Sequence, residues 1–198
     1  MCRAADLVVR RCEARATADD DNTPKRGIGV GILLLSLFVV IPQILVPLAL
    51  PADSVRLPML TSLGQPSTWP YAFGALVCHQ WPDRSFALAG NQLPVCERCL
   101  AVEFGMVAAF GAAVVVKPPS GFFPSLAAFL PRRMRSPFAI LAVGLALMLP
   151  MVLDGGLQLV TAYVSGTPQR FVTGFVYGIG QAGLVIGFVA LALRVSEG

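Results

Sequence analysis

Residues 28–50 read IGVGILLLSLFVVIPQILVPLAL, and this stretch decides the fold class of the chain. It contains no charged side chain, and at about 1.5 Å per residue a helix of this length crosses a hydrocarbon core of about 30 Å. Pro42 and Pro47 lie in its second half, where each removes a backbone N–H and is expected to kink the helix. We therefore interpret residues 28–50 as a transmembrane helix.

Three further apolar segments follow, and the composition of the whole chain agrees with a membrane location. Hydrophobic residues make up 56% of the 198 residues and charged residues only 13%, which is well outside the averages of soluble domains. The sequence thus predicts an all-α polytopic membrane protein, with a transmembrane domain over residues 28–194, an outward loop over residues 51–98 and the lipid bilayer as its surroundings. The expected helices span residues 28–50, 99–116, 138–160 and 171–193.

The segment before the first helix mixes charges of both signs and includes three consecutive aspartates. We expect residues 1–27 to form a disordered cytoplasmic tail in which Cys2 and Cys12 are ordinary reduced thiols. A basic leader followed by an apolar run is also typical of a cleaved signal peptide. Because this apolar run is longer than a usual signal core, we expect the first helix to be retained.

Basic residues are distributed unevenly among the segments that connect the predicted helices. Eleven of the 15 lie in the tail, in the loop between the second and third helices, or after the fourth helix. Because positive charge is retained in the cytoplasm, we expect a multi-pass protein of the cell membrane with both termini cytoplasmic. The basic residues form no patch interleaved with aromatic residues, which argues against nucleic acid as a partner.

The only histidine of the chain and three of its five cysteines gather in the outward loop and at the start of the second helix. Cys78 and His79 are adjacent, and Cys96 and Cys99 form a C-x-x-C pair further along. A Cys3His set consists of the ligands that zinc prefers, and so we predict a metal site on these four residues with zinc as the cofactor. Adjacent side chains do not readily reach one ion together. A metal site formed by the three cysteines together with water or another side chain is therefore an equal alternative.

Two other interpretations of the same cysteines stay open. Cys96 and Cys99 lie at the amino end of the predicted second helix, where the helix dipole favours the reactive thiolate form. With Cys78 as a resolving partner, they would form a redox-active dithiol. Alternatively, the pair forms a structural disulfide in an oxidising compartment, and His79 is then an ordinary loop residue.

Asp154 is an ionisable residue within the predicted third helix, and Arg170 adjoins the start of the fourth. Asp154 lies about 24 Å along a helix that starts at Phe138, and so it remains within the apolar layer. An ionisable group at this depth is a functional candidate, and we name Asp154 and Arg170 as candidate catalytic residues. The sequence also predicts that the two residues form an ion pair that closes the helical bundle, which would account for both of them without catalysis.

Arg84 follows Cys78 by six residues, and Arg98 lies between Cys96 and Cys99. We expect them to form salt bridges with their sequence neighbours, Asp83 and Glu97. The alternative is that these arginines bind an anionic headgroup or substrate.

The residues around these candidates carry a resemblance to a known family. The pattern is C-H-Q-x-P-x-R-S-F, P-V-C-x-R-C, D-G-x-x-Q and R-x-x-T-G, over about residues 71–180. It resembles a family of predicted prokaryotic membrane proteins classified as a domain of unknown function, which implies a four-helix membrane fold and no particular activity. Where that family commonly has an aromatic residue, this chain has Glu103, so the resemblance does not extend to this position. The matching positions are Cys78, His79, Gln80, Pro82, Arg84, Ser85, Phe86, Pro94, Val95, Cys96, Arg98, Cys99, Asp154, Gly155, Gln158, Arg170, Thr173 and Gly174.

The sequence has no G-x-S-x-G, no phosphate-binding glycine loop and no H-E-x-x-H. Our leading hypothesis is a membrane protein with an outward zinc site, whose ion either fixes the loop or polarises a substrate. The alternatives are a membrane thiol–disulfide oxidoreductase and a non-catalytic subunit of a membrane complex. In the last role, a protein partner or a second copy of the chain would contact small residues. Such residues are Gly105, Gly111, Gly174, Gly178 and Gly180.

Overall fold

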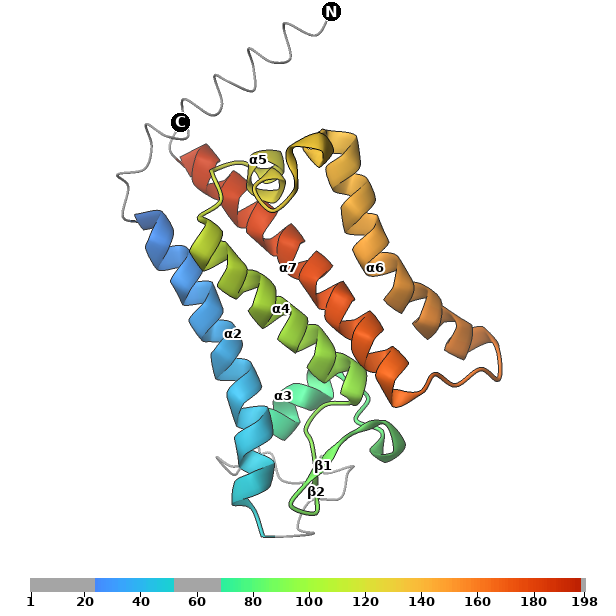
Figure 1. The fold of residues 1–198 in the computed structure, drawn as a ribbon. Coiled ribbons are helices and arrows are strands. Elements are labelled where there is room, and N and C mark those ends of the chain that lie inside the picture. The colour runs from blue at the N-terminus through green and yellow to red at the C-terminus, as the bar shows by residue number, and fades with distance from the viewer. Residues whose placement is uncertain (1–23, 52–68, 197–198) are drawn as a thin grey trace, which may run out of the picture.

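The structure is a computed structural model of the chain, and it describes residues 24–51 and 69–196. Most of the predicted tail, with Cys2 and Cys12, and the first part of the predicted outward loop lie outside the described residues. The part of the chain that is described is predominantly helical, with two short strands (Figure 1). The predicted all-α class is confirmed.

Four helices among the described residues are long and apolar enough to cross a membrane, with mean hydropathies between 1.9 and 2.6. Each begins one to four residues before the start that the sequence predicts. The prediction of four transmembrane helices is thus confirmed. The helices are α2 (Pro24–Ala49), α4 (Glu97–Val116), α6 (Pro137–Val160) and α7 (Thr167–Ser196).

The helix ends follow from local chemistry that hydropathy does not register. Ser136 caps α6, because its Oγ accepts the backbone N–H of Ala139 at 3.2 Å. Pro137 then occupies the first helical position, where an N–H has no helical partner in any case. Lys117 ends α4 in the left-handed conformation, with φ of 52°, and two prolines follow it.

The four helices lie side by side in the order α2, α4, α7 and α6 (Figure 1). α4 packs most extensively against α7, and α2 and α6 lie on the outer sides of this pair. The short helix α5 (Phe122–Ala127) lies near the carboxyl end of α7, where the N–H of Gly121 donates to the carbonyl oxygen of Ala190 at 2.9 Å. The contact between α4 and α7 is therefore the centre of the fold.

Glycines set the distance between α4 and α7. A Cβ atom added to Gly105 would lie 2.1 Å from the carbonyl oxygen of Phe175, and one added to Gly178 would lie 2.1 Å from that of Val102. A Cβ atom at Gly174 would lie 2.6 Å from a backbone oxygen of α4. These glycines, which we considered above for contacts with a partner, are thus used within the chain.

Replacing Gly105 with alanine is expected to lower the free energy of unfolding by about 1–3 kcal/mol, because the added methyl group forces α4 and α7 apart. Gly111→Ala is the matched control on the same helix, since a Cβ atom there meets nothing within 4 Å. It should leave stability unchanged or raise it by up to about 1 kcal/mol through higher helix propensity. Chemical unfolding of both variants in detergent micelles measures the difference. Equal stabilities would contradict the close packing.

The end of the bundle opposite α5 carries a compact segment over residues 69–96 (Figure 1). Its hairpin turns at Ala89 and Gly90, whose positive φ values of 49° and 78° suit a tight hairpin turn. The side chain of Asn91 then donates to the carbonyl oxygen of Pro47 at 3.0 Å, so the hairpin is joined to the end of α2. The elements of this segment are α3 (Trp69–Val77), a 3₁₀ turn (Pro82–Arg84), β1 (Ala87–Leu88) and β2 (Asn91–Gln92).

Candidate metal centre

Three cysteines converge at the end of the bundle that carries α3 and the hairpin. Cys78 directly follows α3, Cys96 is the N-cap residue of α4, and Cys99 lies in the first turn of that helix. Their sulfur atoms all lie within 4.8 Å of one another. All three are free thiols, and Cys78 and Cys96 are buried. The fold thus brings the C-x-x-C pair and a cysteine from before the hairpin to a single point.

Hydrogen bonds centred on Gln80 hold the polypeptide around Cys78. The Nε2 atom of Gln80 donates to the carbonyl oxygens of Tyr71 at 2.9 Å and Pro94 at 2.7 Å, which joins α3 to the segment before α4. The carbonyl oxygen of Gln80 accepts Nε2 of Gln92 at 3.0 Å. Gln80 also has a φ of 50°, a conformation that is uncommon for a residue other than glycine. These contacts fix Cys78 relative to the C-x-x-C pair.

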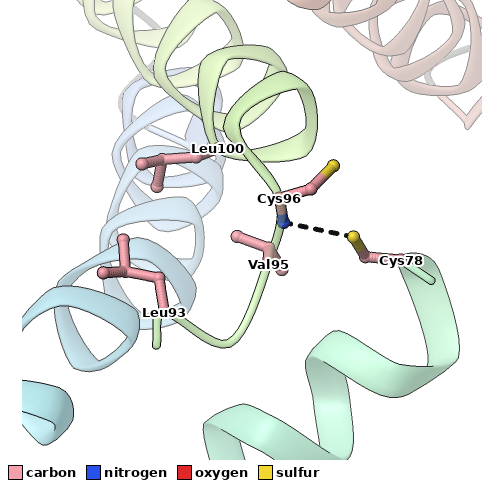
Figure 2. Close-up of a cluster of buried hydrophobic side chains, with 5 residues drawn as sticks. All are labelled: Cys78, Leu93, Val95, Cys96 and Leu100. Atoms are coloured by element: carbon pink, nitrogen blue, oxygen red, sulfur yellow. Dashed lines mark hydrogen bonds between the residues drawn. The ribbon is translucent and has the colours of Figure 1, made fainter. Parts of the chain in front are cut away.

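The sulfur atom of Cys78 accepts two backbone hydrogen bonds. The N–H of Cys96 donates to it at 3.2 Å (Figure 2), and the N–H of Gln80 donates at 3.4 Å. Buried leucine and valine side chains pack around Cys78 and Cys96 and make their surroundings apolar (Figure 2). Because hydrogen bonds to the charged form of a group favour that form, the two N–H groups stabilise a thiolate in this apolar setting.

Hydrogen bonds among the three cysteines shift the pKa values of their thiols in different directions. Hydrogen bonds from Cys78 and then Cys99 lower the pKa of Cys96 far below its usual range, although burial acts in the opposite direction. The pKa of Cys78 is raised, chiefly because of its hydrogen bond with Cys96, and the hydrogen bonds from Cys99 and from the two backbone N–H groups only partly offset this rise. Cys96 is therefore the first of these thiols to ionise. Since like charges oppose one another, ionisation of all three requires a cation.

His79, the fourth predicted ligand, lies beside the cysteine cluster and outside it. Among the described residues, the group of ligand atoms within 4.8 Å of one another consists of the three sulfur atoms. The side chain of His79 is exposed, and its ring packs edge-on against Trp81 with the ring centroids 5.6 Å apart. The structure thus brings together three of the four predicted ligands.

The predicted ion pair between Asp154 and Arg170 is wrong, because each residue has a different partner. Asp154 pairs with Arg98, and Nη1 of Arg170 lies 3.5 Å from Oε2 of Glu97. The predicted bridge between Arg98 and Glu97 is wrong for the same reason. Consecutive residues of an α-helix point about 100° apart, so Glu97 and Arg98 reach different neighbours. The two residues between the cysteines of the C-x-x-C pair therefore attach the start of α4 to α7 and α6.

Ser165, in the loop between α6 and α7, connects the two ion pairs. Its Oγ atom accepts hydrogen bonds from Nη2 of Arg98 at 3.2 Å, from Nε of Arg170 at 3.3 Å and from Nε2 of Gln158. Ser165 is 1% exposed, and Asp154 and Arg170 are also buried. Both predicted catalytic candidates are thus engaged in one buried polar network.

Sequence reasoning missed several members of this network. Oγ1 of Thr167 donates to Oε1 of Glu97 at 3.0 Å, and the hydroxyl group of Tyr163 donates to Oδ1 of Asp154 at 3.2 Å. Hydroxyl residues between two helices or at the start of a helix carry no sequence signal for such contacts. The sequence does indicate Gln158, which follows Asp154 by four residues on the same helix, and its Nε2 lies 3.5 Å from Oδ2 of Asp154.

Comparisons with known proteins agree with this architecture. A family model described as a predicted membrane protein family, DUF2085, matches residues 78–184. An uncharacterized protein of Methanocaldococcus jannaschii is 33% identical over 109 residues, which cover 54% of this chain and 60% of that protein. An uncharacterized protein of Methanothermobacter thermautotrophicus is 34% identical over 120 residues, which cover 60% of this chain and 93% of that protein. No solved structure matches the chain.

The matched region begins at Cys78 and includes all three clustered cysteines and both ion pairs. It covers more than half of the chain, and the resemblance to a membrane protein family is confirmed. The chain belongs to the DUF2085 family of predicted membrane proteins.

Proposed function

We propose that this protein holds one zinc ion on the sulfur atoms of Cys78, Cys96 and Cys99. The observation that carries the proposal is the convergence of three free sulfur atoms within 4.8 Å of one another. Zinc favours thiolate ligands and is almost always bound by four ligands in a tetrahedral arrangement. The three cysteines supply three of these positions, and the bound ion ties the compact segment over residues 69–96 to the start of α4.

The hydrogen bonds at Cys78 support a metal–thiolate site over a structural disulfide. Backbone N–H groups of Cys96 and Gln80 donate to this sulfur atom. A thiolate keeps much of its negative charge when it binds a metal, and such donors stabilise it, whereas a disulfide sulfur atom carries no charge to stabilise. Partners of this kind also orient metal ligands, as the residues behind a metal site commonly do.

The fourth position determines what the ion does. If His79 turns toward the cysteines, a Cys3His set closes the site and the ion has a structural role. If water occupies the position, the site stays open, and the ion can polarise a substrate. The exposed ring of His79 packs on Trp81, which supports the open form as the starting state.

Asp154 and Arg170 are proposed to position the site. Each is tied by an ion pair to one of the two residues between Cys96 and Cys99, and so both hold the start of α4 in place. A carboxylate bound to an arginine is a poor general base, because the positive charge lowers its affinity for a proton. The ion pairs therefore support a positioning role over direct participation in chemistry.

We further propose that the metal site faces the outside of the cell membrane. At the α5 end of the bundle lie Lys117, Arg194 and the arginines that precede α6, whereas Arg84, Arg98 and Arg170 lie at the cysteine end. Arg98 and Arg170 are neutralised there by acidic partners. The α5 end thus carries the excess of positive charge that is retained in the cytoplasm.

Protein purified without oxidant or added metal is expected to carry about one zinc per chain, because three thiolates bind this ion tightly. Elemental analysis measures the ion. A membrane-impermeant thiol reagent, applied to intact cells before and after a chelator, should label the cysteine cluster only after the ion is removed. Metal-free protein with a Cys96–Cys99 disulfide would contradict the metal site. Labelling of Cys2 in intact cells would contradict the orientation.

A thiol–disulfide oxidoreductase is the second candidate, and the lowered pKa of Cys96 favours it. Cys96 lies at the amino end of α4, where a thiolate is the attacking group in disulfide exchange. A mixed disulfide formed there with a substrate protein would be resolved by Cys99, which releases the reduced substrate and leaves a Cys96–Cys99 disulfide. Cys96 is only 4% exposed, however, and exchange requires access to the sulfur atom.

A further inference from the structure

A second polar contact lies away from the cysteines, between α2 and α4. Nε2 of Gln43 donates to Oε1 of Glu103 at 2.9 Å. Gln43 is fully buried, with 0% of its surface exposed. Glu103 is the only charged residue of α4 beyond its first turn, and α2 has no charged residue in its apolar span. A polar pair is therefore isolated between two apolar helices.

The two side chains lie at matching depths. Gln43 comes six residues before the end of α2 at Ala49, and Glu103 comes six residues after the start of α4 at Glu97. At about 1.5 Å per residue, each lies about 9 Å inside its helix. The two helices run in opposite directions (Figure 1), so these positions meet. An ionised carboxylate at such a depth, without a cationic partner, is expensive.

Two oxygen atoms of the pair have no hydrogen-bond partner. They are Oε1 of Gln43 and Oε2 of Glu103, and both atoms are buried. An ionised carboxylate leaves both unpaired, because each oxygen atom is then an acceptor. A carboxylic acid supplies the missing donor, because its O–H group donates one hydrogen bond. A single proton on Oε2 of Glu103 therefore gives both this atom and Oε1 of Gln43 a hydrogen-bond partner.

We propose that Glu103 and Gln43 form a proton-binding site within the membrane-spanning bundle. In the occupied state, the carboxylic acid of Glu103 donates to Oε1 of Gln43, and Nε2 of Gln43 donates to Oε1 of Glu103. The two hydrogen bonds close a ring, and no buried oxygen atom of the pair is left without a partner. A calcium or magnesium ion fits poorly, because these ions take six or more oxygen ligands and the pair leaves two atoms unpaired.

The ionisable groups of the neighbouring helix α7 do not pair with Glu103. On α7, which packs against α4, these groups are Tyr177 and the arginines Arg170 and Arg194 near the two ends of the helix. Arg170 is already paired with an acid at the start of α4. Cys96 and Cys99 lie at the start of the helix that carries Glu103, and thiolates there would add negative charge near its carboxyl group.

The proton-binding site does not require a bound metal ion, but it lies close to the cysteines. Glu103 follows Cys99 by four residues, which is about one helical turn. Thiols release protons when they bind a metal ion. The proton site therefore places an acid that can exchange its proton one turn away from groups whose protonation changes on metal binding.

Infrared spectroscopy of the full chain in lipid vesicles tests the proposal, because protonated and ionised carboxyl groups absorb at different frequencies. At neutral pH, we expect a protonated carboxyl band that shifts in heavy water and is lost in Glu103→Gln. Glu97→Gln is the matched control on the same helix. Because Glu97 is paired with Arg170, this variant should lose a carboxylate band and keep the protonated one.

Gln43→Leu provides a second variant that retains the acid. It should keep the protonated band and shift it to the frequency of a carboxyl group that lacks the amide partner. Absence of the protonated band at neutral pH in the wild-type chain, or its persistence in Glu103→Gln, would overturn the proposal. Loss of the band when sodium replaces potassium would also overturn it, because a metal ion would then occupy the oxygen atoms.

Discussion

Cys78→Ser, Cys96→Ser and Cys99→Ser are each expected to abolish zinc binding and to loosen the compact segment over residues 69–96. Zinc contributes about 10–16 kcal/mol of binding free energy in zinc-finger peptides, and the ligands of a site share it. Removing one of three thiolates therefore removes the ion together with its contribution to folding. Elemental analysis of each variant gives the zinc content, and hydrogen exchange of residues 69–96 measures the loosening.

Two further variants serve as controls for these substitutions. Cys12→Ser removes a thiol that lies outside the described residues and is not one of the proposed ligands, and it should retain about one zinc per chain. His79→Ala should lose the ion if the imidazole is the fourth ligand and retain it if water holds that position. Zinc retained at the wild-type level in any of the cluster variants would contradict the three-cysteine site.

A dithiol oxidoreductase would respond differently to the same substitutions. If Cys96 is the attacking thiolate, Cys99→Ser leaves it unable to resolve a mixed disulfide, so a substrate protein stays covalently attached. Electrophoresis without reductant would then show a larger species that disappears on reduction and is absent from Cys96→Ser. Such a species, together with zinc-free wild-type protein, would establish the second candidate over the first.

Breaking the ion pair between Arg98 and Asp154 is expected to lower the free energy of unfolding by about 3–5 kcal/mol. The two side chains are 17% and 9% exposed, so either Arg98→Met or Asp154→Leu leaves an uncompensated charge in a poorly hydrated site. The double variant should be less destabilised than the sum of the two single variants, because it leaves neither charge behind. Chemical unfolding of the single and double variants yields this coupling energy.

Asp83→Asn is the control for removing a charge, because Asp83 is exposed in the 3₁₀ turn. It should change the free energy of unfolding by less than about 0.5 kcal/mol. If the effects of Arg98→Met and Asp154→Leu are additive, the two residues do not interact in the folded protein. If both single variants resemble Asp83→Asn, the network does not stabilise the bundle.

The membrane-spanning helices were predictable because hydropathy is a property of each segment by itself. A helix satisfies its own backbone hydrogen bonds, so an apolar stretch such as residues 28–50 identifies a span without reference to its neighbours. The helix boundaries were less predictable. Capping at Ser136 and the left-handed conformation of Lys117 depend on a few local atoms. Hydropathy is averaged over a window of many residues and does not register them.

The cysteine site was predictable in part. The spacing of Cys96 and Cys99 places one at the N-cap and the other in the first turn of α4, so that the two lie close together, and this follows from helix geometry. The approach of Cys78 depends on Gln80, whose side chain bonds to carbonyl oxygens on two separate segments. The hairpin was not apparent in the sequence, because strands of two residues are too short to show an alternating pattern.

The sequence by itself determined that this is an all-α membrane protein, where the four long apolar helices of the described residues lie, and which residues carry its thiols and buried charges. Only the tertiary structure decided which of these residues meet. The sequence favoured pairing Asp154 with Arg170. In the structure, the orientation of α4 about its own axis places Arg98 beside Asp154 and Glu97 beside Arg170. The physical reason is that burial of a charge is a property of one segment, but its partner depends on how two helices approach and rotate. That approach is set by close backbone contacts between two helices, such as the one at Gly105. The sequence of either helix alone does not reveal these contacts.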